Sequence, residues 1–110
     1  MEEFVKGDIV VVPFPFSNLS SYKRRPALVL INLPGADVIL CQITSKLRAD
    51  DYSIQLNEED FIQGGLDRIS CVKVDRIFTA EKSIILRKAG TINSQKLAEV
   101  KNVFITLLGN

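Results

Sequence analysis

The 110-residue chain contains no histidine at all. This absence excludes nucleophiles activated by histidine, histidine metal sites and paired-histidine nuclease chemistry. Cysteine is scarce: Cys41 and Cys71 each lie in an apolar run, and they match neither a disulfide framework nor a zinc spacing. Such cysteines are typical of small buried side chains in a reducing cytoplasm. Any catalysis must therefore rely on other groups, and we predict no metal and no cofactor.

Long apolar segments and a strong net charge are also missing. No apolar stretch approaches the roughly 18 residues of a membrane span, and the N-terminus MEEFVKGDIV lacks a signal-peptide core. The formal net charge is +1, from 14 Lys and Arg against 13 Asp and Glu, so a nucleic-acid site would have to be a local patch. We expect a cytoplasmic protein with no membrane segment, folded as a single domain over residues 1–110.

The chain consists mostly of short β-branched runs separated by turn signals. These runs predict strands at 7–16, 25–32, 37–45, 52–56, 69–80 and 83–90. Pro13 and Pro15 predict that the first strand leaves the sheet at its far end. Asn57 predicts a capped helical turn, and QGGL at 63–66 predicts a turn.

The last segment has a helical period instead. Asn93 or Ser94 can cap a helix, and Gly109 can end it. The predicted apolar face consists of Leu97, Val100, Val103, Phe104, Leu107 and Leu108. The pattern as a whole predicts a mainly β fold, a small closed or nearly closed barrel with a C-terminal helix.

Two short segments carry candidate chemistry. Lys23, Arg24 and Arg25 run directly into Pro26, and an arginine fork suits a phosphate. A predicted strand ends in Thr44-Ser45-Lys46, where hydroxyls beside a cation can bind a phosphate oxygen. The alternative for both segments is an ordinary solvated strand end.

The remaining polar signals are weaker. Gly64-Gly65 lacks the Lys-Ser/Thr of a phosphate-binding loop and is interpreted as a tight turn. Asp67, Asp75 and the pair at 50–51 show no spacing typical of a carboxylate pair or a magnesium site, so we interpret them as surface residues.

Taken together, GDIVVVPFPF, KRRPALVL, DVILCQITS and the later GGL and D.IFT segments resemble the MazF/PemK (Kid-type) toxins of type II toxin–antitoxin systems, and most closely their PemK-like branch. The resemblance runs from Gly7 to the C-terminal helix. It implies an SH3-like barrel of the MazF/PemK/CcdB type with about five to seven strands. It also implies a homodimer that cuts single-stranded RNA, often at specific sequences, and leaves 2′,3′-cyclic phosphate and 5′-hydroxyl ends without a metal.

The resemblance assigns roles residue by residue. The family's catalytic Arg falls on Arg25 and its catalytic Thr on Thr44. Its RNA-covering loop falls on 17–24, with Ser20 or Ser21 as the contributing serine. A Gln used by some members falls on Arg76, and the Glu-Gln stretch of many members is replaced by SNLSSYK.

Further RNA contacts are expected around this pair. The implied RNA-binding cations and hydroxyls are Lys23, Arg24, Ser45, Lys46, Arg48 and Arg76. Phe14, Phe16 and Tyr22 are candidates for stacking on bases, with core or dimer packing as the alternative for the two phenylalanines.

The family also implies a cognate antitoxin with an acidic, hydrophobic tail that inhibits the toxin. Two other functions stay open at this point. One is a barrel that acts by protein binding, as the CcdB gyrase inhibitor does, and the other is a degenerate homologue that binds RNA without cutting it.

Overall fold

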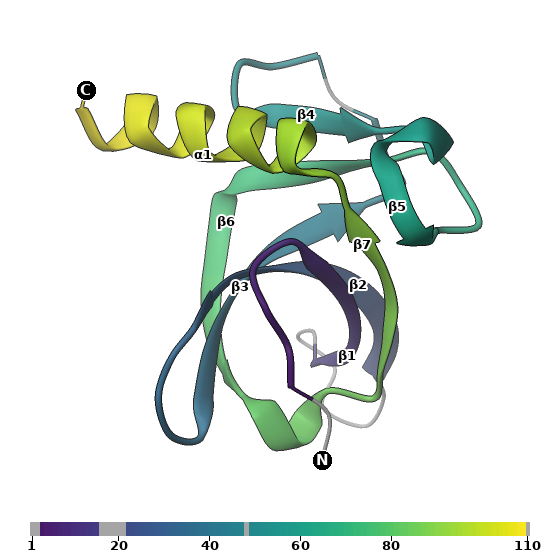
Figure 1. The fold of residues 1–110 in the computed structure, drawn as a ribbon, viewed down its shortest axis with the longest axis vertical. Helices are drawn as coiled ribbons and strands as arrows, with labels where there is room; N and C mark the ends of the chain where they lie inside the picture. Colours follow the sequence, from purple (N-terminus) through teal and green to yellow (C-terminus); the bar gives the residue numbers. More distant parts are fainter. Residues whose placement is uncertain (1–2, 16–21, 48, 110) are drawn as a thin grey trace.

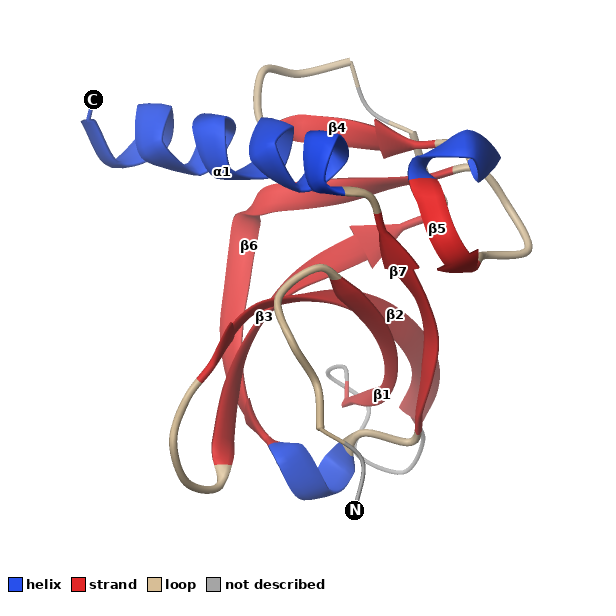
Figure 2. Ribbon diagram, viewed as in Figure 1, coloured by secondary structure: helices blue, strands red, loops and turns tan. Residues whose placement is uncertain are grey.

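The computed structural model describes residues 3–15, 22–47 and 49–109. These residues form seven strands, one α-helix and two short 3-10 helices (Figures 1 and 2). The strands are β1 (Asp8–Pro15), β2 (Tyr22–Asn32), β3 (Asp37–Thr44), β4 (Ser53–Leu56), β5 (Phe61–Gly64), β6 (Ser70–Glu81) and β7 (Arg87–Ile92). The helices are η1 (Glu58–Asp60), η2 (Lys82–Ile84) and α1 (Ser94–Gly109).

The strands form one antiparallel sheet in the order β4-β6-β3-β2-β1-β7-β5. The sheet curls on itself, with η2 at one end of the curl and α1 lying along β4 and β6 at the other (Figure 1). This architecture confirms the predicted mainly β, barrel-like fold with a C-terminal helix. No helix in the described part of the chain is both long and apolar enough to cross a membrane.

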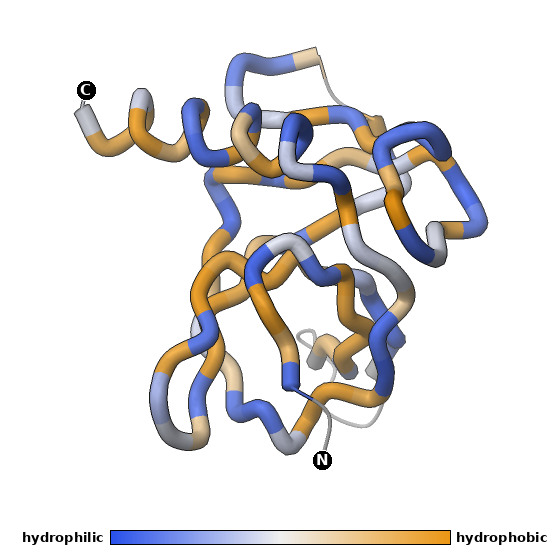
Figure 3. The backbone as a smooth tube through the Cα atoms, viewed as in Figure 1, coloured by the Kyte–Doolittle hydropathy of each residue, from blue (hydrophilic) through white to orange (hydrophobic). Residues whose placement is uncertain are grey.

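Both faces of the central strands are buried, which explains why β1 is a continuous apolar run rather than an alternating one. On one face, Ile9, Leu28 and Cys41 pack in a cluster that includes Val100 of α1. On the other face, a second cluster is closed by Phe4, Phe78, Ala80 and Ile85, which are only partly buried. Its buried members are Val10, Val12, Ala27, Val29, Val38 and Leu40. Figure 3 shows hydrophobic residues concentrated along these strands.

Asp8, in the Gly-Asp pair at the start of β1, connects two strands of the sheet. Asp8 is buried, and its carboxylate accepts hydrogen bonds from the Val5 amide and the Thr91 hydroxyl, both at 2.9 Å. Lys88 Nζ lies 3.9 Å from the same carboxylate. Because Thr91 and Lys88 belong to β7, Asp8 ties the first strand to the last one and compensates its own burial with hydrogen bonds.

The prediction that Pro13 and Pro15 end the strand was wrong. Pro13 pairs with Arg24 and Pro15 with Tyr22 in the β1–β2 ladder. The backbone carbonyl of Val11 accepts a hydrogen bond from Leu86, so alternate residues of β1 from Val11 onward turn their backbone groups away from β2. Pro13 and Pro15 are alternate residues of this kind, so the N–H groups they lack would point away from β2. On that side, within the described residues, pairing with β7 stops at Val11, so no ladder hydrogen bond is lost.

Two further expectations need correction. Gln63 and Gly64 belong to β5, which pairs with β7, rather than to a turn over 63–66. Leu108 is 70% exposed and does not pack on the core. The rest of the predicted helix face does pack there, through Leu97, Val100, Val103, Phe104 and Leu107.

Strand β6 carries an irregularity in its pairing with β3. Cys41 pairs with Ile77 and Ile43 pairs with Val72, so Gln42 alone stands opposite residues 73–76. Such a bulge bends the strand and redirects its side chains. The bend of β6 is visible in Figure 1.

A candidate phosphate site at the ends of β2 and β3

Arg25 and Thr44 are brought together by the register of β2 and β3. The ladder between these strands ends at the pair Ala27–Gln42. Arg25 and Thr44 each lie two residues beyond that pair, so they share its face of the sheet and stand on neighbouring strands. Arg25 is half-buried and pairs with Val12 of β1. The two residues assigned by resemblance therefore lie on one face of the sheet at neighbouring strand ends, although Arg25 is not among the residues that line the cavity beside Thr44.

The Thr44 side chain is held at the strand end. Its Oγ1 accepts a hydrogen bond of 3.1 Å from the Lys46 amide. Lys46 and Ser45 are exposed where the chain turns away from the sheet. The hydroxyl hydrogen of Thr44 remains available to a ligand, because a hydroxyl can donate one bond while it accepts another.

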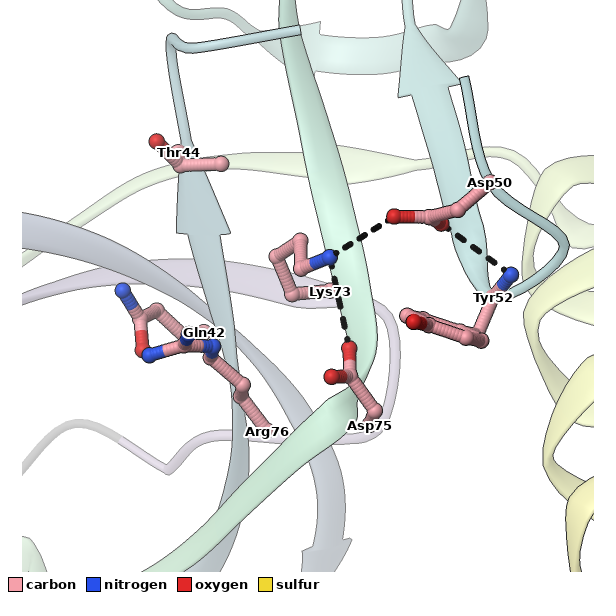
Figure 4. Close-up of a pocket in the computed structure, with 7 residues that line it drawn as sticks. All are labelled: Gln42, Thr44, Asp50, Tyr52, Lys73, Asp75 and Arg76. Carbon is pink, nitrogen blue, oxygen red and sulfur yellow. Dashed lines mark hydrogen bonds and ion pairs between the residues drawn. The ribbon is translucent and has the colours of Figure 1, made fainter. Parts of the chain in front are cut away.

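A cavity of about 310 Å³ opens beside Thr44 (Figure 4). Figure 4 shows side chains from β3, β6 and the segment before β4 around this space. The lining residues are Gln42, Thr44, Asp50, Tyr52, Lys73, Asp75 and Arg76. The bulge of β6 contributes three of these lining residues, because Lys73, Asp75 and Arg76 all lie within it.

Lys73 organises the floor of this cavity. Its ammonium group lies 3.2 Å from the Asp50 carboxylate and 3.5 Å from that of Asp75. It also donates to Ser53 Oγ at 3.0 Å and lies 4.9 Å from the centre of the Tyr52 ring. A buried ammonium group is tolerated because its charge and its hydrogen-bonding capacity are both matched.

The same contacts act on the Asp50 carboxyl. A hydrogen bond from Ser53, with further contributions from Lys73 and the Tyr52 amide, lowers the pKa of Asp50 below its ordinary value. The carboxylate thus stays ionised and continues to bind Lys73. The polar groups of the cavity therefore form one connected network rather than independent surface residues.

Strand alternation divides the predicted cationic cluster between two faces. Lys23 is exposed, pairs with Phe14 and shares the face of Arg25. Arg24 and Ser45 point to the opposite face, where they line a second cavity. Arg76 joins Thr44 at the first cavity. Ser20, Ser21 and Arg48, together with Phe16, lie outside the described residues.

The aromatic prediction has a partial answer. Phe14 packs edge-to-face against Phe78, with ring centres 5.3 Å apart. This contact favours the packing alternative for Phe14 over stacking on a base. Within the described residues, no group of three or more Cys, Asp or Glu side chains is arranged to hold a metal ion.

The sequence analysis missed Lys73, and it interpreted Asp50 and Asp75 as surface residues. One signal was available: a single lysine interrupts the otherwise apolar run SCVKV. A lysine in such a run must find partners when the strand is buried. Which carboxylates supply them depends on the pairing of β4 and β6, and no sequence pattern indicates that pairing here.

Residues 5–108 match the family described as PemK-like, MazF-like toxin of type II toxin-antitoxin system. A comparison with curated protein sequences gives no match. The chain therefore belongs to the PemK-like and MazF-like toxins, which confirms the resemblance.

Solved structures share the fold at low sequence identity. A mycobacterial endoribonuclease is 18% identical, with a TM-score of 0.76 over 99% of this chain and 94% of its own. The MazE-MazF structure from Deinococcus radiodurans in form II is 23% identical, with a TM-score of 0.77 over 94% of each chain. A mycobacterial endoribonuclease in complex with its cognate antitoxin is 18% identical, with a TM-score of 0.72 over 97% of this chain and 96% of that one.

Proposed function

We propose that this toxin is a metal-independent, sequence-specific endoribonuclease that cuts single-stranded RNA and thereby inhibits translation and growth. The observation that carries the proposal is the placement of Arg25 and Thr44 on neighbouring strands and on one face of the sheet. Family membership and the mycobacterial endoribonucleases of the same fold support it. We assign Arg25 and Thr44 as the catalytic residues.

The chemistry fits a protein without histidine. The 2′-hydroxyl of the RNA attacks the adjacent phosphorus, loses its proton, and displaces the 5′-oxygen, which gains a proton. The products are a 2′,3′-cyclic phosphate and a 5′-hydroxyl end. Arg25 holds the non-bridging oxygens and neutralises the charge that develops on them, while Thr44 positions the phosphate. The need for a 2′-hydroxyl restricts the reaction to RNA.

The cavity beside Thr44 accommodates a nucleotide next to the scissile phosphate. Gln42 and the two carboxylates offer hydrogen-bonding groups to a base edge, and Tyr52 offers an aromatic ring. Arg76 adds a cation on the same side. Lys23 and Lys46 are exposed at the ends of β2 and β3, where they attract the RNA backbone.

The proposal includes two protein partners. One solved neighbour is an endoribonuclease in complex with its cognate antitoxin. We propose that this chain likewise binds a cognate antitoxin, whose acidic and hydrophobic tail covers the RNA site. The second partner is another copy of the chain in a homodimer.

The test is cleavage of a mixed single-stranded RNA in EDTA, with the product ends mapped. Wild type should leave cyclic-phosphate ends at defined sequences and should not cut DNA of the same sequence. Arg25→Ala should lose roughly a hundredfold or more in rate, as removal of a transition-state donor does. Thr44→Ala should lose about tenfold to a hundredfold, typical of one hydrogen bond to a charged group.

Matched controls separate chemistry from folding. Arg25→Lys keeps the charge but not the bidentate fork, so most of the activity should still be lost. Thr106→Ala and Lys101→Ala change exposed residues of α1 and should cut RNA as wild type does. No cutting by a folded wild type would reject the enzyme and favour a binding protein, to be tested by DNA gyrase supercoiling.

A further inference from the structure

A second cavity, of about 320 Å³, lies on the opposite face of the sheet from Arg25 and Thr44. It opens at the same ends of β2 and β3, because Arg24 precedes Arg25 and Ser45 follows Thr44. Two further arginines reach it from other parts of the fold, Arg68 before β6 and Arg87 at the start of β7. Apolar side chains of β1, β2 and β7 complete its wall.

Among the described residues, the arginines of this second cavity have no ion-pair partner. Arg24, Arg68 and Arg87 are exposed, and none of them forms an ion pair with any described residue. The carboxylate of Asp67 lines the same cavity without coming within ion-pair distance of them. Three lysines elsewhere, Lys73, Lys88 and Lys96, each lie within 4 Å of a carboxylate.

Three guanidinium groups around one cavity repel each other, and arginine cannot relieve this repulsion by losing its proton. An anion in the cavity removes the repulsion. The planar fork of arginine matches phosphate oxygens, and the Ser45 hydroxyl adds a neutral donor on the same wall. The hydroxyl of Ser70, by contrast, already donates to the Arg68 carbonyl at 3.0 Å.

We propose that this second cavity binds an RNA phosphate that flanks the one held by Arg25 and Thr44. The inference rests on the proposed ribonuclease function and extends it to a second contact. RNA is favoured as the ligand because consecutive residues serve the two sites: Arg24 with Arg25, and Ser45 with Thr44. A polyanion that crosses the ends of β2 and β3 reaches both faces. Arg68 and Arg87 thus bind substrate outside the reacting centre.

The experiment measures binding without cleavage. The probe is a single-stranded RNA of mixed sequence with every 2′-hydroxyl methylated, so that it cannot cyclise, and its affinity is followed by fluorescence anisotropy as salt is raised. For single strands, each phosphate contact contributes about 0.7 to the slope of log affinity against log salt. Arg68→Ala and Arg87→Ala should each reduce the slope by about that amount and weaken binding, so that the KM for RNA cleavage rises.

Matched variants define what overturns the proposal. Arg87→Lys should keep the wild-type slope because it keeps the charge, and Lys101→Ala on α1 should also keep it. Circular dichroism verifies that each variant is folded. A wild-type salt slope in both alanine variants would reject the second site. The site would also be rejected if the two variants bound an acidic antitoxin peptide more weakly but bound RNA as wild type does. Reduced slopes in a protein that never cuts RNA would support the site and reject the ribonuclease instead.

Discussion

Lys73 holds the cavity beside Thr44 together and is not one of the residues proposed to act on RNA. Its ammonium group joins Asp50, which precedes β4, to Asp75 in the bulge of β6. It thereby holds together two walls of the cavity beside Thr44. Lys73 is buried while the carboxylates are partly exposed, so the interaction fixes geometry more than it adds stability.

Cys41 lies directly behind this cavity wall. Its thiol is fully buried and donates to the Lys73 carbonyl at 2.8 Å. Burial raises the pKa of the Cys41 thiol to about 12, and the negative charge of Asp75 adds to the rise. Cys41 and Cys71 are both free, so neither the fold nor the site depends on a disulfide.

The raised pKa of Cys41 leads to a prediction about pH. Above the ordinary value of 9.0 the unfolded thiol ionises, while the folded thiol keeps its proton up to about 12. The free energy of unfolding should therefore fall between these values, by up to about 1.4 kcal/mol per pH unit. Urea titrations of wild type and Cys41→Ala at a series of pH values from 8 to 11 give the free energy of unfolding at each pH. The contribution of Cys41 is the difference between the two proteins in the slope of that free energy against pH. Parallel slopes would contradict it.

At the scale of elements, β5 and β7 approach unusually closely. A Cβ atom added at Gly90 would lie 2.6 Å from the Gln63 carbonyl oxygen, and one at Gly64 would lie 2.2 Å from that of Ala89. Gly64 also has a φ of +66°, which favours glycine. This contact holds β5, and with it the segment that carries Arg68 to the second cavity.

Gly90→Ala should therefore destabilise the protein. The added methyl group meets backbone atoms that cannot rotate away, and overpacking of this kind typically lowers the free energy of unfolding by about 1–3 kcal/mol. Gly65→Ala is the matched control, because a Cβ there meets nothing within 4 Å. It should stay within roughly 0.5 kcal/mol of wild type in urea unfolding. Equal stability of the two variants would show that β5 and β7 can separate without cost.

At the scale of the whole molecule, several large apolar side chains remain on the surface. Ile62, Ile69, Ile105 and Leu108 are all more than half exposed, with Leu108 the most exposed at 70%. They come from different parts of the chain: β5, the segment before β6, and α1. A contiguous apolar patch, rather than single scattered side chains, marks a place where a protein meets a partner.

Membership of the PemK-like and MazF-like toxins leads us to expect a homodimer in solution. Light scattering on the purified chain at micromolar concentration should give twice the mass of one chain, with no change in 0.5 M salt because apolar contacts are insensitive to ionic screening. A monomeric mass at this concentration would contradict the prediction. Loss of the dimer at high salt alone would show that charges rather than apolar contacts hold it together.

The amino-acid sequence by itself determined the fold class and the family, and it predicted Arg25 and Thr44 as the catalytic residues. Short β-branched runs, turn signals and a final helical period are local features, and they indicated most of the elements. The capping of α1 followed as well, since Asn93 Oδ1 accepts from the Lys96 amide at 2.7 Å. The prediction that the prolines end β1 was wrong because a missing N–H group costs a hydrogen bond only where a neighbouring strand is present on that side. The position of the neighbouring strand is not a local property of the sequence.

Only the tertiary structure decided which polar side chains line each of the two cavities. Alternation along β2 sends Arg24 and Arg25 to opposite faces, so that Arg24 lines the second cavity while Arg25 lies on the face of Thr44. The bulge of β6 places Lys73, Asp75 and Arg76 beside Thr44. Arg68 and Arg87 meet Arg24 only because β7 pairs with both β1 and β5. Register, bulges and strand order arise from long-range pairing, and for that reason only the folded chain displays them.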